Sequence, residues 1–367
     1  MNNPIAYIAD GVFTGAHWMS AHAVLVRDGR ILSLLPRNEI PSGVEVREFQ
    51  DAVIAPAFTD VQIYGASGKL FSAYPEPASL QVLVAHNRSG GTALCLPTIA
   101  TNSNDIYYKA IDAIRVYWDQ GGKGVYGLHL EGPWINAVKR GAHVEKFIEA
   151  PEPAKVAALL GYGKGVIRMI TLAPEKCNDE VIGLIREQGI LISAGHSDAT
   201  YRQATDAFEA GIPAVTHLFN AMSPLHHRAT GLTGATMDHG SVMASIIPDG
   251  IHVDFSAVSI AKKIMQERLF VITDAVTETS KGPYPHVAAG NKFESGGILS
   301  GSALKMNEAV RNLVLQVGLS MEEALRMCSL YPARMLGKDG HTGMIREGYE
   351  ASLVVLNKKF EVVELVS

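Results

Sequence analysis

The amino-acid sequence predicts an α/β protein, a (β/α)8 TIM barrel with a small β-sandwich domain formed by the N- and C-terminal segments. Three observations lead to this prediction. Eight short apolar, β-rich runs alternate with helical patterns through the middle of the chain. Both ends of the chain have the alternation of apolar and polar residues that is typical of strands. The chain has 367 residues, of which 47% are hydrophobic, so it can bury a large core.

The two terminal segments are expected to pair into one sheet domain. Residues 5–15, 22–36 and 44–50 alternate apolar and polar side chains, and so do residues 343–366. Asp-Gly pairs at Asp10-Gly11 and Asp28-Gly29 favour turns between these strands. We therefore predict a small β domain from residues 1–53 and 340–367, and a barrel domain from residues 54–339.

The barrel strands are predicted from eight runs, each bounded by turn residues or by a helical pattern. These runs are FTDVQIYG, TALCLPTIA, VYGLHLEG, VIRMITLAPE, ILISAGHS, AVTHLFN, MASIIPDGIHV and LFVITDA. Helices are predicted between them, over residues 79–90, 104–120, 179–189, 200–211 and 256–265. A further helical pair, over residues 302–318 and 320–337, follows the eighth run. Gly301-Ser302 precedes it and can form a helix cap, an anion nest, or both.

Four polar residues lie at or near the C-terminal ends of these runs, which is the catalytic rim of a barrel. Glu131, His196, His217 and Asp274 fall at or near the ends of the third, fifth, sixth and eighth runs, respectively. One carboxylate and two imidazoles can bind a divalent metal and leave a position open for water. A second carboxylate can accept the proton of that water. The placement predicts a metal-dependent hydrolase.

Each of these residues also has a structural interpretation. Glu131 can accept hydrogen bonds from loop amides, His196 can be a loop histidine before a helix, and His217 a satisfied core histidine. Asp274 can cap a turn. His129 lies two residues before Glu131 and is expected to be a hydrogen-bonded interior histidine.

Two further residues follow the sixth and seventh runs. His252 can donate to a carbonyl oxygen, or it is a surface histidine. Arg228 suits a phosphate or carboxylate, or it is a solvated loop residue.

Composition excludes several function classes. The net charge is -5, without the basic face that nucleic-acid binding requires. No apolar run has the length of a membrane span, and the N-terminal residues lack the pattern of a signal peptide. The three cysteines are far apart and are expected to be reduced thiols. We therefore expect a cytoplasmic protein that binds neither nucleic acid nor a membrane.

Several segments taken together resemble one family. They are HLEGPWIN, KRGAH, TLAPE, GHSDATY, THLFNAMSPLHHR, PDGIHVD, VITDA, LSGSAL and LYPARMLG, and they span most of the chain. In this order they resemble the N-acetylglucosamine-6-phosphate deacetylase family of the amidohydrolase superfamily. The resemblance implies a barrel with a small β domain built from both termini. It also implies hydrolysis of the acetamide of N-acetylglucosamine 6-phosphate, a step of amino-sugar catabolism.

The resemblance assigns roles to individual residues. Glu131, His196 and His217 are similar to the zinc ligands of the family, and Asp274 to its catalytic acid and base. The implied substrate contacts are Ala142, His143, Asn220, Ala221, His252, Leu299, Ser300 and Gly301. Arg228 is similar to the arginine that binds phosphate in the neighbouring subunit's site, which implies a homodimer.

Two positions depart from the family patterns. Many amidohydrolases have His-x-His at the end of the first strand, where this chain has Gln62 and Tyr64. Neither is a good zinc ligand, so we predict one divalent metal per subunit, zinc or alternatively iron. Ala229-Thr230 stand where the family often has Glu-Pro. Three alternatives stay open: an N-acetylgalactosamine-6-phosphate deacetylase, another amidohydrolase, and, in a different class, a non-catalytic barrel scaffold.

Overall fold

The computed structural model describes residues 3–290 and 292–367 of the chain. The chain divides into two compact units. One contains the residues up to Asp60 together with residues 87–94 and 305–367, and the other contains residues 61–86 and 95–304. The predicted domain limits at residues 53 and 340 remain a prediction.

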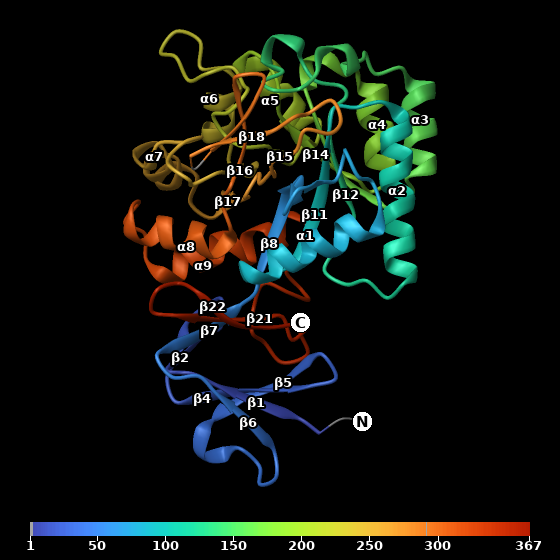
Figure 1. Ribbon diagram of the computed structural model, residues 1–367. Helices are drawn as coiled ribbons and strands as arrows, with labels where there is room; N and C mark the ends of the chain where they lie inside the picture. Colours follow the sequence, from blue (N-terminus) through green and yellow to red (C-terminus); the bar gives the residue numbers. More distant parts are fainter. Residues whose placement is uncertain (1–2, 291) are drawn as a thin grey trace. The chain divides into compact units, whose positions relative to one another are not determined.

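The first unit contains two β-sheets, to which both the N-terminal and the C-terminal segments contribute (Figure 1). The four-stranded sheet has the order β5-β4-β1-β6, from β1 (Ile5–Ile8), β4 (His22–Arg27), β5 (Arg30–Pro36) and β6 (Glu45–Glu48). The five-stranded sheet has the order β22-β21-β7-β2-β3, from β2 (Gly11–Phe13), β3 (Trp18–Met19), β7 (Ala52–Pro56), β21 (Leu353–Asn357) and β22 (Val362–Val366). Antiparallel pairing of β21 with β7 joins the two termini and confirms the predicted sandwich.

Apolar side chains from both sheets share one core in this unit. Val24 and Val26 of β4 pack in the same cluster as Ile54 of β7 and Val355 of β21. Because neighbouring residues of a strand face opposite sides, every second residue reaches this core. The two sheets therefore stabilise each other by burying one face each.

The two predicted Asp-Gly turns differ. Asp28 and Gly29 have φ values of 48° and 73° and form the two-residue hairpin between β4 and β5. Asp10-Gly11 lies where the chain passes from β1 of one sheet to β2 of the other, so it closes no hairpin.

The predicted helical pair is present in the first unit as α8 (Met306–Leu315), α9 (Met321–Cys328) and α10 (Leu330–Met335). The expected cap at Ser302 is wrong, because Lys305 is the residue that precedes α8. Ser302 ends a strand, and its hydroxyl donates to the carbonyl oxygen of Thr273 at 2.5 Å.

A parallel eight-stranded barrel contains all eight predicted runs. Its strands are β8 (Phe58–Ile63), β11 (Thr92–Ala100), β12 (Leu128–Glu131), β13 (Ile167–Leu172), β14 (Leu191–Ala194), β15 (Ala214–Val215), β16 (Met243–Ile246) and β17 (Leu269–Val271), in that order. The first and last strands meet through a parallel bridge between Ile63 and Ala275. The amide of Asp274 donates to the carbonyl oxygen of Gln62 at 3.0 Å. The barrel is thus nearly closed, and its closure brings residue 62 beside residue 274.

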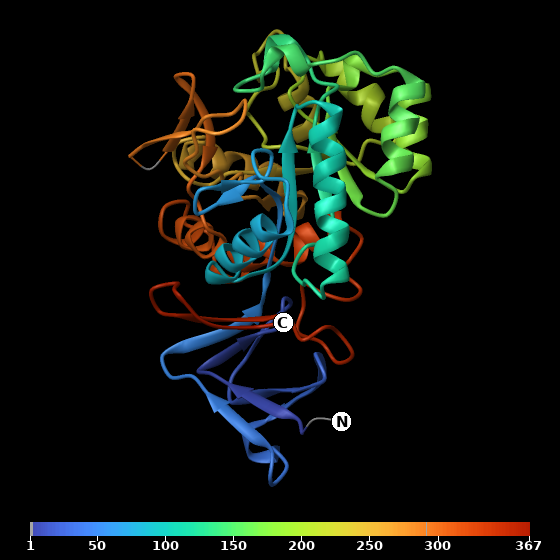
Figure 2. The same cartoon turned by 45° about the vertical axis from the view of Figure 1, so that its right-hand side comes forward.

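Helices follow most of the barrel strands. They are α1 (Pro77–Ser89), α2 (Asn104–Asp119), α3 (Pro153–Tyr162), α4 (Asp179–Glu187), α5 (Tyr201–Glu209), α6 (Gly231–Asp238) and α7 (Phe255–Met265). The five predicted helices are confirmed, and α3 and α6 are additional. Figures 1 and 2 show α2, α3 and α4 together on one flank of the strands.

Short strands occur near the catalytic rim. The pair β9 (Gly65–Ala66) and β10 (Lys69–Leu70) follows β8, and a three-stranded sheet is formed by β18 (Val287–Ala289), β19 (Lys292–Ser295) and β20 (Ile298–Ser302). Within the described ranges, no helix combines the length and apolar character that crossing a membrane requires.

Candidate metal centre and active site

The barrel brings the four residues predicted at strand ends together at one rim. Glu131 ends β12, while His196, His217 and Asp274 lie two or three residues beyond β14, β15 and β17. All four side chains are buried. His196, His217 and Asp274 have φ values of 47°, 36° and 54°. L-residues other than glycine seldom adopt this left-handed backbone conformation. It persists only where the surrounding structure holds it, and residues in such conformations are frequent at functional sites.

Three atoms that could bind a metal lie close together in a triangle. Glu131 Oε1 lies 3.2 Å from His196 Nε2 and 3.0 Å from His217 Nε2, and the two nitrogens lie 3.1 Å apart. His196 Nδ1 lies 2.9 Å from the carbonyl oxygen of Lys139, which can only accept. The ring proton of a neutral His196 is therefore on Nδ1, and its Nε2 directs a lone pair toward a carboxylate oxygen.

This donor set fits a divalent cation. A lone pair facing a carboxylate and a second imidazole is unfavourable unless a positive charge lies between them. For zinc bonds of about 2.0–2.1 Å, tetrahedral ligands are roughly 3.3 Å apart, close to the distances found here. The Lys139 carbonyl fixes the tautomer and the ring orientation of His196, as partners of metal-bound histidines commonly do.

Charges in the centre favour the ligand forms. Burial alone would raise the pKa of Glu131, but His196, His143 and His217 outweigh it and hold the pKa well below its ordinary value. Burial lowers the pKa of His217. At neutral pH Glu131 is therefore ionised and His217 neutral, the forms that bind a metal.

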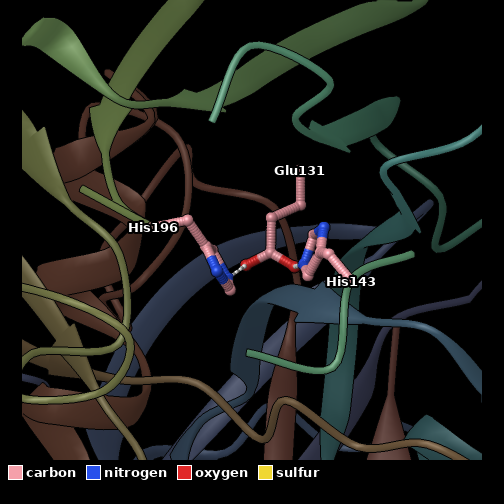
Figure 3. A group of neighbouring side chains, drawn as sticks. All are labelled: Glu131, His143 and His196. Carbon is pink, nitrogen blue, oxygen red and sulfur yellow. Dashed lines mark hydrogen bonds and ion pairs between the residues drawn. The ribbon is translucent and has the colours of Figure 1, made fainter. Parts of the chain in front are cut away.

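His143 approaches the other oxygen of Glu131, as Figure 3 shows. Its Nε2 lies 3.0 Å from Glu131 Oε2, and its Nδ1 lies 2.7 Å from Thr101 Oγ1. Burial lowers the pKa of His143 to about 4, so the ring is neutral. Glu131, His143 and His196 also form a group that could hold a cation, with ligand atoms within 4.8 Å of one another. The set with His217 is tighter, because its three atoms share the Oε1 side of Glu131.

Gln62 connects the metal-ligand candidate with the base candidate. Its amide nitrogen lies 2.8 Å from Glu131 Oε1, from Asp274 Oδ1 and from the hydroxyl of Tyr64. Two of these partners are carboxylate oxygens, which only accept, so the nitrogen of the amide must face them. The Tyr64 hydroxyl donates to Glu131 Oε2. Burial, and then the charges of Glu131 and Asp274, raise the pKa of Tyr64 well above its usual value, so it remains a donor.

His252 is held by a carboxylate three residues earlier. Its Nδ1 lies 2.7 Å from Asp249 Oδ2, and Asp249 Oδ1 accepts from the amides of Ile251 and His252 at 2.8 Å each. Burial would raise the pKa of Asp249, but the hydrogen bonds from His252 and from these amides lower it overall. The ionised Asp249 therefore keeps the Nδ1 of His252 protonated and directs the ring.

Glu175 ties three rim loops together. Its carboxylate accepts from Asn136 Nδ2 at 2.8 Å, from the amide of Asp198 at 2.7 Å and from Ser197 Oγ at 2.6 Å. The amide of Asn136 also donates to the carbonyl oxygen of His196 at 2.9 Å. Glu175 thus holds the loop that carries His196 against the loop that follows Glu131. Glu175 was not assigned from the sequence, although a carboxylate at the end of the fourth β-rich run is the same signal that identified Glu131.

A cavity of about 250 Å³ opens onto this centre. Every predicted site residue except Arg228 lines it: Glu131, Ala142, His143, His196, His217, Asn220, Ala221, His252, Asp274, Leu299, Ser300 and Gly301. Tyr284, His286 and Ser72 also line it, and no sequence signal singled them out. Gly301 has a φ of 66°, and a Cβ there would lie 2.3 Å from Val276 Cγ1, so this wall position requires glycine.

Arg228 lies outside the cavity wall. It is exposed, in the loop between β15 and α6, and its amide donates to His226 Nδ1 at 3.3 Å. Among the lining residues in the part of the chain that the structure describes, none is a lysine or an arginine. One subunit alone therefore supplies no permanent cation to this cavity.

His129 lies below the rim, inside the barrel, as an interior histidine. Its Nδ1 lies 3.0 Å from the carbonyl oxygen of Val61, and its Nε2 lies 2.8 Å from Thr171 Oγ1. Burial lowers its pKa to about 4. The structural interpretation of His129 is confirmed.

Known proteins resemble this chain over almost its whole length. Residues 53–366 match the family model described as the amidohydrolase family. The N-acetylglucosamine-6-phosphate deacetylase of Homo sapiens is 37% identical over an alignment of 360 positions that covers 92% of this chain and 88% of that protein. The N-acetylgalactosamine-6-phosphate deacetylase of Escherichia coli O157:H7 is 32% identical over an alignment of 366 positions that covers 96% of this chain and 95% of that protein. The crystal structure of N-acetylglucosamine-6-phosphate deacetylase from Pasteurella multocida superposes with a TM-score of 0.94, at 32% identity, over 99% of this chain and 97% of that one.

Proposed function

The chain belongs to the amidohydrolase family, and from this premise we propose that it is a metal-dependent deacetylase of N-acetylated hexosamine 6-phosphates. Its substrate is N-acetylglucosamine 6-phosphate, and its products are glucosamine 6-phosphate and acetate. The observation that carries the proposal is the convergence of Glu131, His196, His217 and Asp274 at the floor of one cavity.

One divalent metal per subunit, zinc or alternatively iron, would be held by Glu131, His196 and His217. When bound, it lowers the pKa of water from the bulk value toward roughly 7 and polarises the acetamide carbonyl. Gln62 and Tyr64 direct N–H and O–H groups at Glu131 and Asp274, and neither residue type is a preferred zinc ligand. This supports a site for a single metal.

Asp274 and His252 perform the proton and charge chemistry. Asp274 accepts a proton from the attacking water as the water oxygen bonds to the acetamide carbon. The proton of Asp274 then passes to the leaving nitrogen as the C–N bond breaks. His252 is oriented by the bond between its Nδ1 and Asp249. With hydrogen on both ring nitrogens, its Nε2 donates to the carbonyl oxygen as that oxygen becomes negative, an interaction worth about 3 kcal/mol per donor.

The remaining cavity residues bind the sugar. Ala142, His143, Asn220, Ala221, Leu299, Ser300 and Gly301 form this part of the wall. Arg228 of a second subunit binds the phosphate, so the functional unit is a homodimer. This assignment is supported by the cavity's lack, among the described residues, of a lysine or arginine of its own, since a phosphate dianion needs a cationic partner.

A substrate comparison tests the proposal. Purified protein is analysed for metal content, and acetate release is measured with N-acetylglucosamine 6-phosphate, its galacto epimer and unphosphorylated N-acetylglucosamine. We expect about one metal per chain, loss of activity with a chelator, restoration by zinc, and the highest kcat/KM on the gluco phosphosugar. A protein without metal and without acetate release would instead be a non-catalytic barrel.

The galacto epimer is the second candidate, because the E. coli O157:H7 relative is named for it. A higher kcat/KM on N-acetylgalactosamine 6-phosphate would assign the chain to that activity.

Complementation tests the dimer. Arg228→Met and Asp274→Asn should each be inactive alone, but a mixed dimer contains one complete site if Arg228 acts in the neighbouring subunit. Coexpression should restore about a quarter of wild-type activity, since about half of the dimers are mixed and each has one intact site. No recovery on coexpression would place Arg228 in its own subunit's site or outside the reaction.

A further inference from the structure

We propose that Tyr64 and Gln62 are positioning residues, which hold Glu131 for metal binding and tie Asp274 to it through one shared amide donor. This inference rests on the proposed function and names how the same site is organised. Both residues come from the first strand and its end, and closure of the barrel brings them against Glu131 and Asp274.

The two oxygens of Glu131 have different partners. Oε1 faces His196 and His217, whereas Oε2 accepts from the Tyr64 hydroxyl and lies 3.0 Å from His143 Nε2. A carboxylate whose Oε2 is held by donors can present only Oε1 to a metal. The Tyr64 hydroxyl therefore fixes the orientation of Glu131, so that the carboxylate would bind a metal through Oε1 alone.

Gln62 links the two carboxylates. Glu131 Oε1 and Asp274 Oδ1 are each 2.8 Å from the same amide nitrogen, so the two oxygens lie within twice that distance of each other. The two N–H groups of Gln62 can each donate to one of these oxygens. Gln62 therefore fixes the separation of the two groups.

Tyr64 stabilises Gln62 in turn. The Tyr64 oxygen lies 2.8 Å from the Gln62 nitrogen and shares that nitrogen's two hydrogens with the two carboxylates, while the Tyr64 hydrogen goes to Glu131. Its ring packs with Leu70, Val276 and Tyr284. Removal of the hydroxyl alone leaves that packing in place, so Tyr64→Phe isolates the hydrogen bonds.

The experiment compares two test variants with one matched control. Tyr64→Phe removes the phenol, and Gln62→Met removes the amide donor from a side chain of similar length. Tyr107→Phe is the control, because Tyr107 is also fully buried but does not line the cavity. Its hydroxyl accepts a hydrogen bond from the backbone amide of Asn102 at 2.9 Å. Zinc affinity is measured by chelator competition without substrate. The visible absorption of the cobalt(II) forms, kcat, KM and the thermal midpoint are measured in parallel.

We expect zinc affinity to fall about 10- to 100-fold in Tyr64→Phe and Gln62→Met, with an altered cobalt spectrum. kcat should fall by a similar factor, and more in Gln62→Met because Asp274 loses its donor too, while KM stays near wild type. Tyr107→Phe should lower only the thermal midpoint. Wild-type zinc affinity in both test variants, whatever their kcat, overturns the proposal. Because the zinc measurement uses no substrate, it decides the inference even if the protein hydrolyses neither phosphosugar.

Discussion

Replacement of Asp274 by asparagine tests the proposed proton transfer with almost no change in shape. The asparagine oxygen can still accept from the Gln62 amide, which lies 2.8 Å from Asp274 Oδ1. The backbone of residue 274 has a φ of 54°, a conformation that asparagine adopts more readily than most residues. We therefore expect the Asp274→Asn variant to fold, with a stability change of no more than about 1–3 kcal/mol.

The expected loss is catalytic. General base catalysis by a positioned carboxylate contributes about 10²- to 10⁴-fold, and an amide cannot accept the proton. This corresponds to roughly 3–5 kcal/mol of transition-state stabilisation. Metal content should stay near one per chain, because the predicted ligands Glu131, His196 and His217 are unchanged.

The assay is acetate release from the preferred phosphosugar, together with elemental analysis of the same preparation. Asp254→Asn is the matched control: Asp254 caps α7 by accepting from the amide of Ser256 at 2.8 Å, and asparagine caps equally well. The control should keep wild-type turnover. Near-normal kcat in Asp274→Asn would refute the role of Asp274 as the base, and loss of the metal would assign it to ligation instead.

Two further predictions concern contacts at the rim, and a third concerns a histidine inside the barrel. Glu175→Gln should weaken zinc binding about tenfold, because an amide group cannot accept from all three donors that now hold the His196 loop. Chelator competition measures the zinc dissociation constant, and an unchanged constant would contradict this prediction. Asp249→Asn should lower kcat about 10- to 100-fold at unchanged metal content, because His252 loses the carboxylate that orients it. The measurement is steady-state kinetics with metal analysis, and a retained kcat would show that Asp249 has a purely structural role. Burial lowers the pKa of His129 from 6.5 to about 4. As the pH falls through 6.5, His129 is protonated in the unfolded chain but not in the folded protein, so the free energy of unfolding decreases until about pH 4. Urea unfolding of the metal-free proteins should show His129→Gln losing about 3 kcal/mol less than wild type over that interval, and equal losses would argue against a neutral buried His129.

The fold could be predicted because its signals are local. Strand runs, turn residues and helix periodicity depend on neighbours in the sequence, and all eight barrel strands lie where those signals place them. Helix α6 was missed because its sequence, GLTGATMD, contains two glycines and little helical periodicity. The same local reasoning placed Glu131, His196, His217 and Asp274 at one rim, since parallel strands end on the same side of a barrel.

The interactions between those residues depended on packing that no local pattern encodes. Closure of the barrel sets the Gln62 amide between Glu131 and Asp274, although residues 62 and 274 lie far apart in the sequence. Likewise, His143 turns its Nε2 to Glu131 Oε2, and Glu175 joins loops from three strands. The sequence by itself determined which chemical groups reach the rim, because strand direction follows from residue order. Only the tertiary structure decided which of these groups touch, because side-chain distances arise from the lateral packing of the eight strands.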